Sequence, residues 1–347
     1  MAQPLTGAAV WHGKDMATSS RWIRELSPAA LDEIDAALRA VRDRPWQTIT
    51  RADFPLPTLG PLLAAVADEL EQGSGMVKLR RIPVERYALD DLRRLYVGLA
   101  SHVGTLVEQN RSGELMRDIR DEGADVGQRY GQVETAPGQV FTSSYARTLS
   151  NGRLRFHTDR CDVVSLLVIR KAKAGGLSKI VSAVSVSNEI LKRRPDLHAL
   201  LWQDYWRSRQ GEEAGGEKKV FALPIFCMRD GKFSTQYSRT FVEAAQKLPN
   251  VPRMSAAQDE ALDLHAQVCE ELCFTMDFEP GDLQLLNNHV TYHGRTHYED
   301  ADGEDQDRLL LRMWIAPPNS RALPPSYAPI WGTTAPGVPR GGIAQPV

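Results

Sequence analysis

The stretch FHTDRCDVVSLLVI, residues 156–169, combines the two features on which the interpretation of this chain depends. Residues 163–169 form an apolar run of strand length, typical of a buried strand. Just before it, His157 and Asp159 are two residues apart, and side chains at i and i+2 of an extended segment point to the same side. An imidazole and a carboxylate there could bind one metal ion. An exposed histidine beside a solvated aspartate remains the alternative, because an H-x-D pattern arises by chance in about half of chains like this.

Downstream of this stretch the chain is rich in expected strands. They are expected at 180–186, at 226–228 and 233–237 around the turn 229–232, at 274–278 and 283–286 around the turn 279–282, and at 309–315. One helix interrupts them, beginning with a capping box at Ser255 and Gln258. Short strands separated by turns favour a sandwich, jelly roll or barrel. No glycine-rich phosphate-binding motif follows any strand, so a dinucleotide-binding fold has no support.

The first third is predicted to be mainly helical, with helices at about 28–41, 61–71 and 90–99 and a short strand at 76–79. We expect a single domain over 1–347. It divides into a helical N-terminal elaboration (1–105), a lid-like loop (106–150), a jelly-roll core (151–316) and a tail rich in proline and glycine (317–347). Residues 109–150 and 209–219 are candidate lids; a solvated surface loop is the alternative for the second.

The composition excludes several classes of protein. Lys and Arg number 42 against 44 Asp and Glu, a net charge of -2 that argues against a nucleic-acid binder or a polybasic membrane-surface protein. No apolar run is long enough to span a bilayer, and the first residues lack the pattern of a signal peptide. The four cysteines are interpreted as reduced and mostly buried. We therefore expect a cytoplasmic protein that acts on a small molecule, with a homo-oligomer left open.

Three of the eight histidines fall in one segment, at 289, 293 and 297. Their spacing would align them on one helix face and suggest zinc, but the glutamate of H-E-x-x-H is missing and the neighbouring residues favour strand and turn. A facial triad of two histidines and one carboxylate, which leaves open positions on iron, needs only one of the three.

Two arginines interrupt the apolar pattern of the last strand. Arg308 and Arg312 share a face with Leu310 and Trp314 if residues 308–314 are extended. Buried guanidinium groups would need anions, and arginine holds a carboxylate by two parallel hydrogen bonds. A solvent-exposed face with two ordinary surface charges is the alternative.

The ordered set of these motifs resembles the TauD/TfdA (taurine dioxygenase) family of iron(II)- and 2-oxoglutarate-dependent oxygenases. The set is H-x-D, Gly-Gly-x-Ser at 175–178, Pro-Gly-Asp at 280–282, Asn-Asn at 287–288, His-Gly-Arg at 293–295 and a later arginine. The resemblance is good over 150–316 and looser over 20–150. It implies a double-stranded β-helix (jelly roll, cupin-like) core, mainly β with flanking helices, an α+β fold.

The resemblance also assigns roles residue by residue. His157, Asp159 and His293 match the iron ligands, Arg308 matches the arginine that pairs with the distal carboxylate of 2-oxoglutarate, and Ser178 matches a hydroxyl that touches the same cosubstrate. Arg312 matches a position that contacts an anionic substrate or the cosubstrate. His289 and His297 match no ligand and are interpreted as supporting residues. The presence of Asp159 argues against a halogenase.

The implied activity is hydroxylation of an unactivated C–H bond with dioxygen and 2-oxoglutarate, releasing succinate and carbon dioxide. Arg312 favours a small anionic substrate, an amino acid or small acid, including a natural-product intermediate. Tyr145, Arg147, Arg153 and Arg155 could reach the pocket or lie on the surface. The alternatives are desaturation or ring formation with the same cofactors, a metal-dependent hydrolase, and a non-catalytic cupin-like binding protein.

Overall fold

In the computed structural model, two sheets pack face to face. The structure describes residues 3–123, 132–136, 139–142, 147–209, 212–213, 216–301, 303 and 307–343; for 132–136 and 139–142 it describes the backbone alone. The larger sheet has the strand order β1-β2-β16-β8-β19-β3, with β4 also paired to β19, and the smaller has the order β15-β10-β17-β7. One core cluster contains residues from both sheets, among them Val164, Ile180, Leu286 and Trp314. The core is therefore a double-stranded β-helix, as expected.

The strands have the following bounds. In the larger sheet they are β1 (Ile23–Glu25), β2 (Met76–Arg80), β3 (Thr105–Val107), β4 (Met116–Ile119), β8 (Val163–Arg170), β16 (Leu283–Asn287) and β19 (Leu309–Ala316). In the smaller sheet they are β7 (Leu154–His157), β10 (Ser178–Ser182), β15 (Phe274–Met276) and β17 (Thr291–Arg295). Four two-stranded pairs complete the set: β5 (Gln132–Ala136) with β6 (Gln139–Thr142), β9 (Ala174–Gly175) with β18 (Tyr298–Glu299), β11 (Asp204–Ser208) with β12 (Val220–Pro224), and β13 (Phe226–Arg229) with β14 (Lys232–Thr235).

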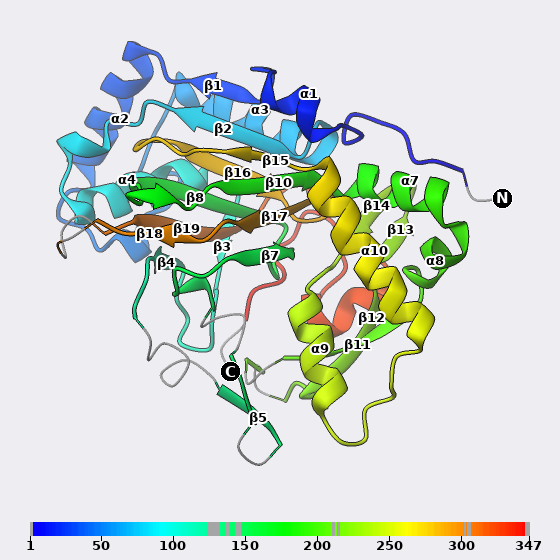
Figure 1. The fold of residues 1–347 in the computed structure, drawn as a ribbon. Coiled ribbons are helices and arrows are strands. Elements are labelled where there is room, and N and C mark those ends of the chain that lie inside the picture. The colour runs from blue at the N-terminus through cyan, green and yellow to red at the C-terminus, as the bar shows by residue number, and fades with distance from the viewer. Residues whose placement is uncertain are drawn as a thin grey trace.

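Helices cover the outer faces of both sheets (Figure 1). Helices α2, α3 and α4 pack against the larger sheet through Leu79, Leu167 and Leu311, and α7 and α10 cover the smaller sheet around Val181 and Tyr292, with α8 packed on them and α9 on β11. The α-helices are α1 (Gly13–Ala17), α2 (Pro28–Ala40), α3 (Leu59–Gln72), α4 (Leu89–Ser101), α7 (Ala183–Arg193), α8 (Pro195–Leu200), α9 (Arg239–Lys247), α10 (Ala256–Leu272) and α11 (Ala328–Trp331). Short 3₁₀ turns are η1 (Trp46–Thr48), η2 (Val84–Arg86) and η4 (Pro325–Tyr327).

Two local expectations were wrong. The strand expected at 180–186 ends at Ser182, whose side chain accepts a hydrogen bond from the Ser185 amide and so starts helix α7. The capping geometry decides here over the alternation of apolar and small polar residues. Within the lid-like region 106–150, β4 pairs with β19 as part of the larger sheet. Residues 124–131, 137–138 and 143–146 of this region, which include Tyr145, lie outside the described residues.

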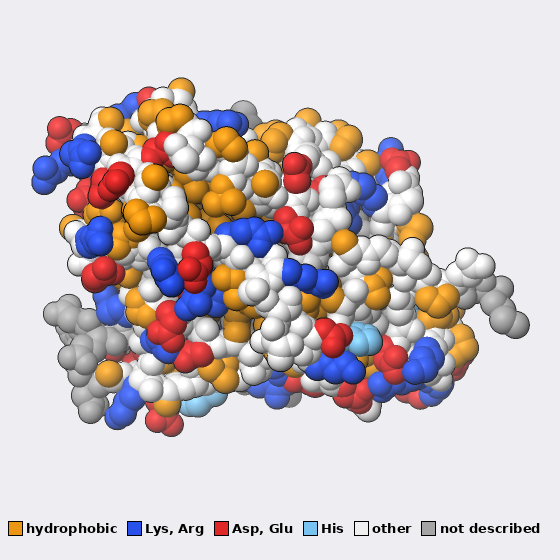
Figure 2. All heavy atoms as spheres, turned by 90° about the horizontal axis from the view of Figure 1, so that it is seen from above, with side chains coloured by type: hydrophobic (Ala, Val, Ile, Leu, Met, Phe, Trp, Pro, Cys, Tyr) orange, Lys and Arg blue, Asp and Glu red, His pale blue; other side chains and the backbone are white. Residues whose placement is uncertain are grey.

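Other global expectations agree with the structure. All four cysteines are free, with Cys161, Cys227 and Cys269 buried. Among the described helices, none has the length and apolar character needed to cross a membrane. Figure 2 shows acidic and basic side chains intermixed over the face seen from above, with no continuous patch of one sign.

Candidate active site

The H-x-D motif and His293 meet on neighbouring strands of the smaller sheet. His157 ends β7 and pairs in register with His293 of β17, so their rings lie 4.3 Å apart between centroids. Asp159 stands in the loop that follows β7. Its Oδ1 is 3.7 Å from His157 Nε2, and its Oδ2 is 3.9 Å from His293 Nε2. All three ligand atoms lie within 4.8 Å of one another, and no other such cluster is found among the described residues.

The surroundings orient these three groups as metal donors. His157 Nδ1 donates to the Arg155 carbonyl oxygen at 2.9 Å, which leaves Nε2 with its lone pair toward the cluster. Burial, helped by His157, lowers the pKa of His293 to about 3, so this imidazole is neutral near pH 7. Burial would raise the pKa of Asp159, but Arg312 and the two histidines outweigh it and the pKa is lowered. Two neutral imidazoles and one carboxylate fit iron(II).

Two further contacts fix Asp159. Its backbone amide donates to the Asn288 side-chain oxygen at 3.0 Å, and its Oδ2 accepts from the Trp314 indole at 3.1 Å. Trp314 shares its strand face with Arg312, as expected. Asn288 belongs to the Asn-Asn motif at 287–288, to which the sequence assigned no role. Both arginines face the interior, since Arg308, just before β19, and Arg312, within it, are only 5% and 7% exposed.

One cavity extends from the triad along β10 and β17 and is here named the Arg308 pocket. It is lined by His157, Ser178, Gln284, His293, Arg295, Arg308 and Arg312, together with apolar side chains. Arg308 Nη1 is buried without a hydrogen-bond partner among the described residues, and its guanidinium lies 4.9 Å from the Tyr298 ring centre. Burial lowers the pKa of Arg308, against the opposing effect of Tyr298 and Asp300. A buried guanidinium with an unbonded nitrogen suits the carboxylate of an anion.

Ser178 and Arg312 occupy different parts of this site. Ser178 is buried, and its hydroxyl lies within 3.5 Å of the Gln284 amide, inside the Arg308 pocket. Arg312 donates through Nε to Gln109 Oε1 at 2.7 Å, while its Nη1 is 3.7 Å from Asp159 Oδ2. Gln109 lies 203 positions away from Arg312 and carried no sequence signal.

A second cavity also borders the triad, shares His157 and Arg312 with the Arg308 pocket, and is here named the Arg209 pocket. It is lined by His157, Asp159 and Trp314 and by several arginines, including Arg147, Arg153, Arg155, Arg160, Arg209 and Arg312. Some of these charges are compensated at the surface, as in the pair of Arg155 with Glu243 at 2.7 Å. Arg160 and Arg209, however, share one carboxylate, Glu217, at 2.7 and 3.3 Å.

Glu212 also lines the Arg209 pocket and is only partly ionised near pH 7. Burial raises its pKa to about 7, against the opposing effect of Arg117, Arg312 and Arg160. Arginines therefore outnumber the carboxylates that line this pocket, which are Asp159 and Glu212.

The other two histidines of the distal segment do not join the triad. His289 lies in the turn between β16 and β17 and contacts Asp162 at 2.7 Å through Nε2. His297 lies beyond the end of β17 and is exposed. Arg295, the last residue of the His-Gly-Arg motif, was missed as a pocket residue. It donates to the carbonyl oxygens of Ser150 and Gly152, both at 2.6 Å, and its Nε and Nη1 are buried without a partner among the described residues.

Comparison with known proteins agrees with this geometry. The chain is 30% identical over 348 residues to FR-33289 synthase of Streptomyces rubellomurinus (strain ATCC 31215), covering 96% of this chain and 97% of that protein. It is 28% identical over 337 residues to the taurine hydroxylase-like protein SAT17 of Stachybotrys chartarum (strain CBS 109288 / IBT 7711), covering 92% and 83%.

Solved structures share the fold. Asparagine oxygenase in complex with Fe(II), 2S,3S-3-hydroxyasparagine and succinate has a TM-score of 0.62 at 14% identity, over 85% of this chain and 94% of that one. The non-heme iron oxygenase OrfP in complex with Fe and alpha-ketoglutaric acid has a TM-score of 0.57 at 15% identity, over 84% and 93%. The model of the family described as "Taurine catabolism dioxygenase TauD, TfdA family" matches residues 35–314. The chain therefore belongs to the TauD/TfdA family of iron(II)- and 2-oxoglutarate-dependent dioxygenases.

Proposed function

We propose that this enzyme hydroxylates an unactivated C–H bond of a small anionic substrate, with 2-oxoglutarate bound in the Arg308 pocket and the substrate in the Arg209 pocket. His157, Asp159 and His293 would hold iron(II). The observation that supports the proposal best is the position of the triad at the junction of two pockets, both lined by His157 and Arg312. Such a junction allows cosubstrate and substrate to approach one metal ion from different sides.

The residues of the Arg308 pocket would have two roles, to bind 2-oxoglutarate and to exclude water from it. Arg308 and Ser178 would hold the distal carboxylate of 2-oxoglutarate, because a buried guanidinium with an unpartnered N–H binds a carboxylate strongly. Apolar residues of the same pocket, such as Leu166 and Leu310, would exclude water. Bound iron(II) would supply the redox chemistry that couples decarboxylation of 2-oxoglutarate to oxidation of the substrate.

The charge of the Arg209 pocket supports an anionic substrate. Arg160 and Arg209 have one carboxylate between them, and Glu212 is partly neutral near pH 7. Arg312 Nη1 lies 3.7 Å from Asp159 Oδ2, and a bound metal ion would coordinate this carboxylate. Amino acids and small acids carry a carboxylate that these arginines could bind. One relative is named FR-33289 synthase. The structures of asparagine oxygenase and OrfP contain 2S,3S-3-hydroxyasparagine and (3S)-hydroxy-L-Arg. These names support a substrate of the amino-acid or natural-product class.

The test has two stages. Anaerobic addition of iron(II) and 2-oxoglutarate to the folded protein should produce a weak visible charge-transfer band. Its absence would contradict the assigned cofactors. Pairs of small acids and their uncharged amides are then screened for stimulated succinate release. Acids should stimulate turnover more than their amides. Equal stimulation by both members of every productive pair would contradict the anionic substrate, and an unsaturated product would favour desaturation over hydroxylation.

A further inference from the structure

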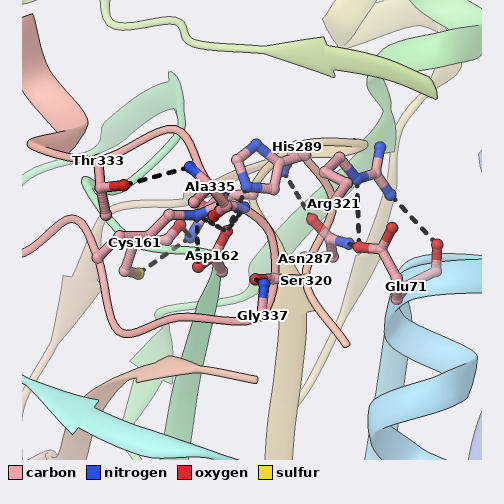
Figure 3. Close-up of polar contacts among 12 residues, drawn as sticks. Glu71, Cys161, Asp162, Asn287, His289, Ser320, Arg321, Thr333, Ala335 and Gly337 are labelled. Atoms are coloured by element: carbon pink, nitrogen blue, oxygen red, sulfur yellow. Dashed lines mark hydrogen bonds and ion pairs between the residues drawn. The ribbon is translucent and has the colours of Figure 1, made fainter. Parts of the chain in front are cut away.

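A buried cluster of charged side chains lies behind the metal-binding loop. Asp162 accepts hydrogen bonds from His289 Nε2 at 2.7 Å and from Arg340 Nη2 at 2.7 Å and Nε at 3.1 Å. All three residues are at most 3% exposed. Figure 3 shows Asp162 and His289 close together, with Ala335 and Gly337 of the C-terminal segment beside them. Asp162 is three positions after Asp159, so the cluster anchors the far end of the loop that carries this ligand.

The cationic member of the cluster comes from the C-terminal segment. Arg340 also donates to the Ala335 carbonyl oxygen at 2.8 Å and lies over Trp331, whose ring is 4.9 Å from that of His289. The C-terminal segment is thus held in place by contacts with the same loop and turn that surround the triad.

The same segment contacts the residue next to Asp159. The Gly342 amide donates to the Arg160 carbonyl oxygen at 2.6 Å, and Arg160 Nε donates to the Ile330 carbonyl oxygen at 2.6 Å. Gly341 has φ +69°, and a Cβ there would lie 2.7 Å from the Arg160 oxygen, so the approach requires glycine. Ile330 and Ile343 line the Arg209 pocket. The tail is therefore part of the wall of the proposed substrate pocket.

The loop needs such support because Asp159 does not lie on a paired strand. Asn288 also supports the loop: its side-chain oxygen accepts from the Asp159 amide, and its side-chain nitrogen donates to the Cys161 carbonyl oxygen, at 3.0 Å each. Thr158 is bonded to Tyr237. A carboxylate that must meet two imidazoles within a few tenths of an ångström depends on the residues that fix its backbone.

We propose that Arg340 is a positioning residue for the metal site: through Asp162 it fixes the loop that presents Asp159, and the segment 330–343 closes the substrate pocket. The proposal rests on the assignment of Asp159 as an iron ligand. It predicts that loss of Arg340 weakens metal binding itself, before any turnover.

Arg321 provides a matched control within the same tail. It is 5% exposed, like Arg340 at 3%, and pairs with a buried carboxylate, Glu71, at 3.2 Å. Glu71 belongs to α3, and Figure 3 shows the pair of Arg321 and Glu71 apart from Asp162. Arg321→Met thus removes a comparable buried ion pair that does not contact the loop of Asp159 directly; Glu71 connects to Asp162 through Asn287 and His289.

The experiment measures iron(II) affinity anaerobically, by titration in the presence of 2-oxoglutarate, in the wild type, Arg340→Met, Arg340→Lys and Arg321→Met, with thermal unfolding of each. Partners beyond the direct ligands change metal affinity by about 10- to 100-fold. We expect at least about a tenfold loss in Arg340→Met, a smaller loss in Arg340→Lys, which keeps the charge, and wild-type affinity in Arg321→Met.

Wild-type affinity in Arg340→Met, or an equal loss in Arg321→Met, would overturn the proposal. If Arg340→Met does not fold, Arg340→Lys decides, because it retains the charge and loses the two-pronged contact with Asp162. Wild-type affinity in that variant would count against the proposal. Failure of the wild type to bind iron would instead overturn the proposed function.

Discussion

Replacement of Arg308 by methionine tests the proposed cosubstrate pocket most directly. The guanidinium of Arg308 is buried, Nη1 has no partner among the described residues, and burial lowers its pKa. In the ligand-free protein this guanidinium is thus buried with one nitrogen unbonded among the described residues, although Tyr298 and Asp300 oppose the effect of burial. We expect Arg308→Met to leave the stability of the ligand-free protein unchanged or to raise it, because methionine fills part of the space without the cost of a buried cation.

The same substitution should weaken the binding of 2-oxoglutarate. Truncating one partner of a buried, hydrogen-bonded charge pair costs about 2–5 kcal/mol. With a middle value of about 3 kcal/mol and about 1.4 kcal/mol per factor of ten, the dissociation constant should rise by about 100-fold. Arg308→Lys keeps the charge but cannot form the two parallel bonds, so it should show an intermediate loss.

The assay is thermal unfolding under anaerobic conditions with iron(II), with and without 2-oxoglutarate. At a concentration 100 times the wild-type dissociation constant, the ligand stabilises the wild type by about 2.7 kcal/mol and a 100-fold weaker variant by about 0.4 kcal/mol. An unfolding entropy of about 2.1 cal/mol/K per residue, over 347 residues, converts these values into shifts in Tm. They are about 4 °C for the wild type and under about 1 °C for the variant.

Two results would refute the reasoning. A ligand-induced shift in Arg308→Met equal to that of the wild type would show that 2-oxoglutarate does not depend on this guanidinium. A large loss of stability in the ligand-free variant would show that Arg308 is a structural residue, compensated by its contact with Tyr298. The charge-transfer band, titrated with 2-oxoglutarate, gives an independent dissociation constant.

Three other predictions concern the triad and the core. His157→Ala and Asp159→Ala should stay folded but lose tight iron(II) binding by anaerobic titration; retained tight binding would exclude them as ligands. His293→Ala should lose the metal and His297→Ala should keep it, because His297 is exposed beyond β17. Loss of the metal in His297→Ala with retention in His293→Ala would show that His293 is not the distal ligand. Burial lowers the pKa of His265 from 6.5 to about 3. Below pH 6.5 the unfolded chain therefore binds a proton that the folded protein excludes, and stability falls by about 2 kcal/mol by pH 5. Denaturant unfolding at pH 7 and 5 should show a shallower loss in His265→Phe; parallel losses would contradict the assignment.

Much of the site was readable from local patterns. The i, i+2 spacing of His157 and Asp159 beside a buried strand indicated one metal-binding point, because side chains alternate on an extended chain. The spacing of Arg308 and Arg312 placed both on the face of Trp314, and the structure confirms that this face is interior. These features depend on residues a few positions apart, whose relative direction is set by the strand itself.

Other features depended on how distant segments meet. The spacing of His289, His293 and His297 left all three open as ligands. The register of β17 against β7 brings only His293 opposite His157, while the turn before β17 directs His289 to Asp162. The strand expected through 186 became α7 because the hydroxyl of Ser182 caps a helix.

The sequence alone thus determined the donor types, the strand that carries them and the family resemblance, since these follow from local spacing and motif order. Spacing left three histidines open and the family resemblance selected His293, while only the tertiary structure showed that Gln109 holds Arg312 and that residues of the proline- and glycine-rich tail line the pocket. Contacts between residues more than a hundred positions apart arise from sheet register and packing, and a pattern along one segment does not encode them.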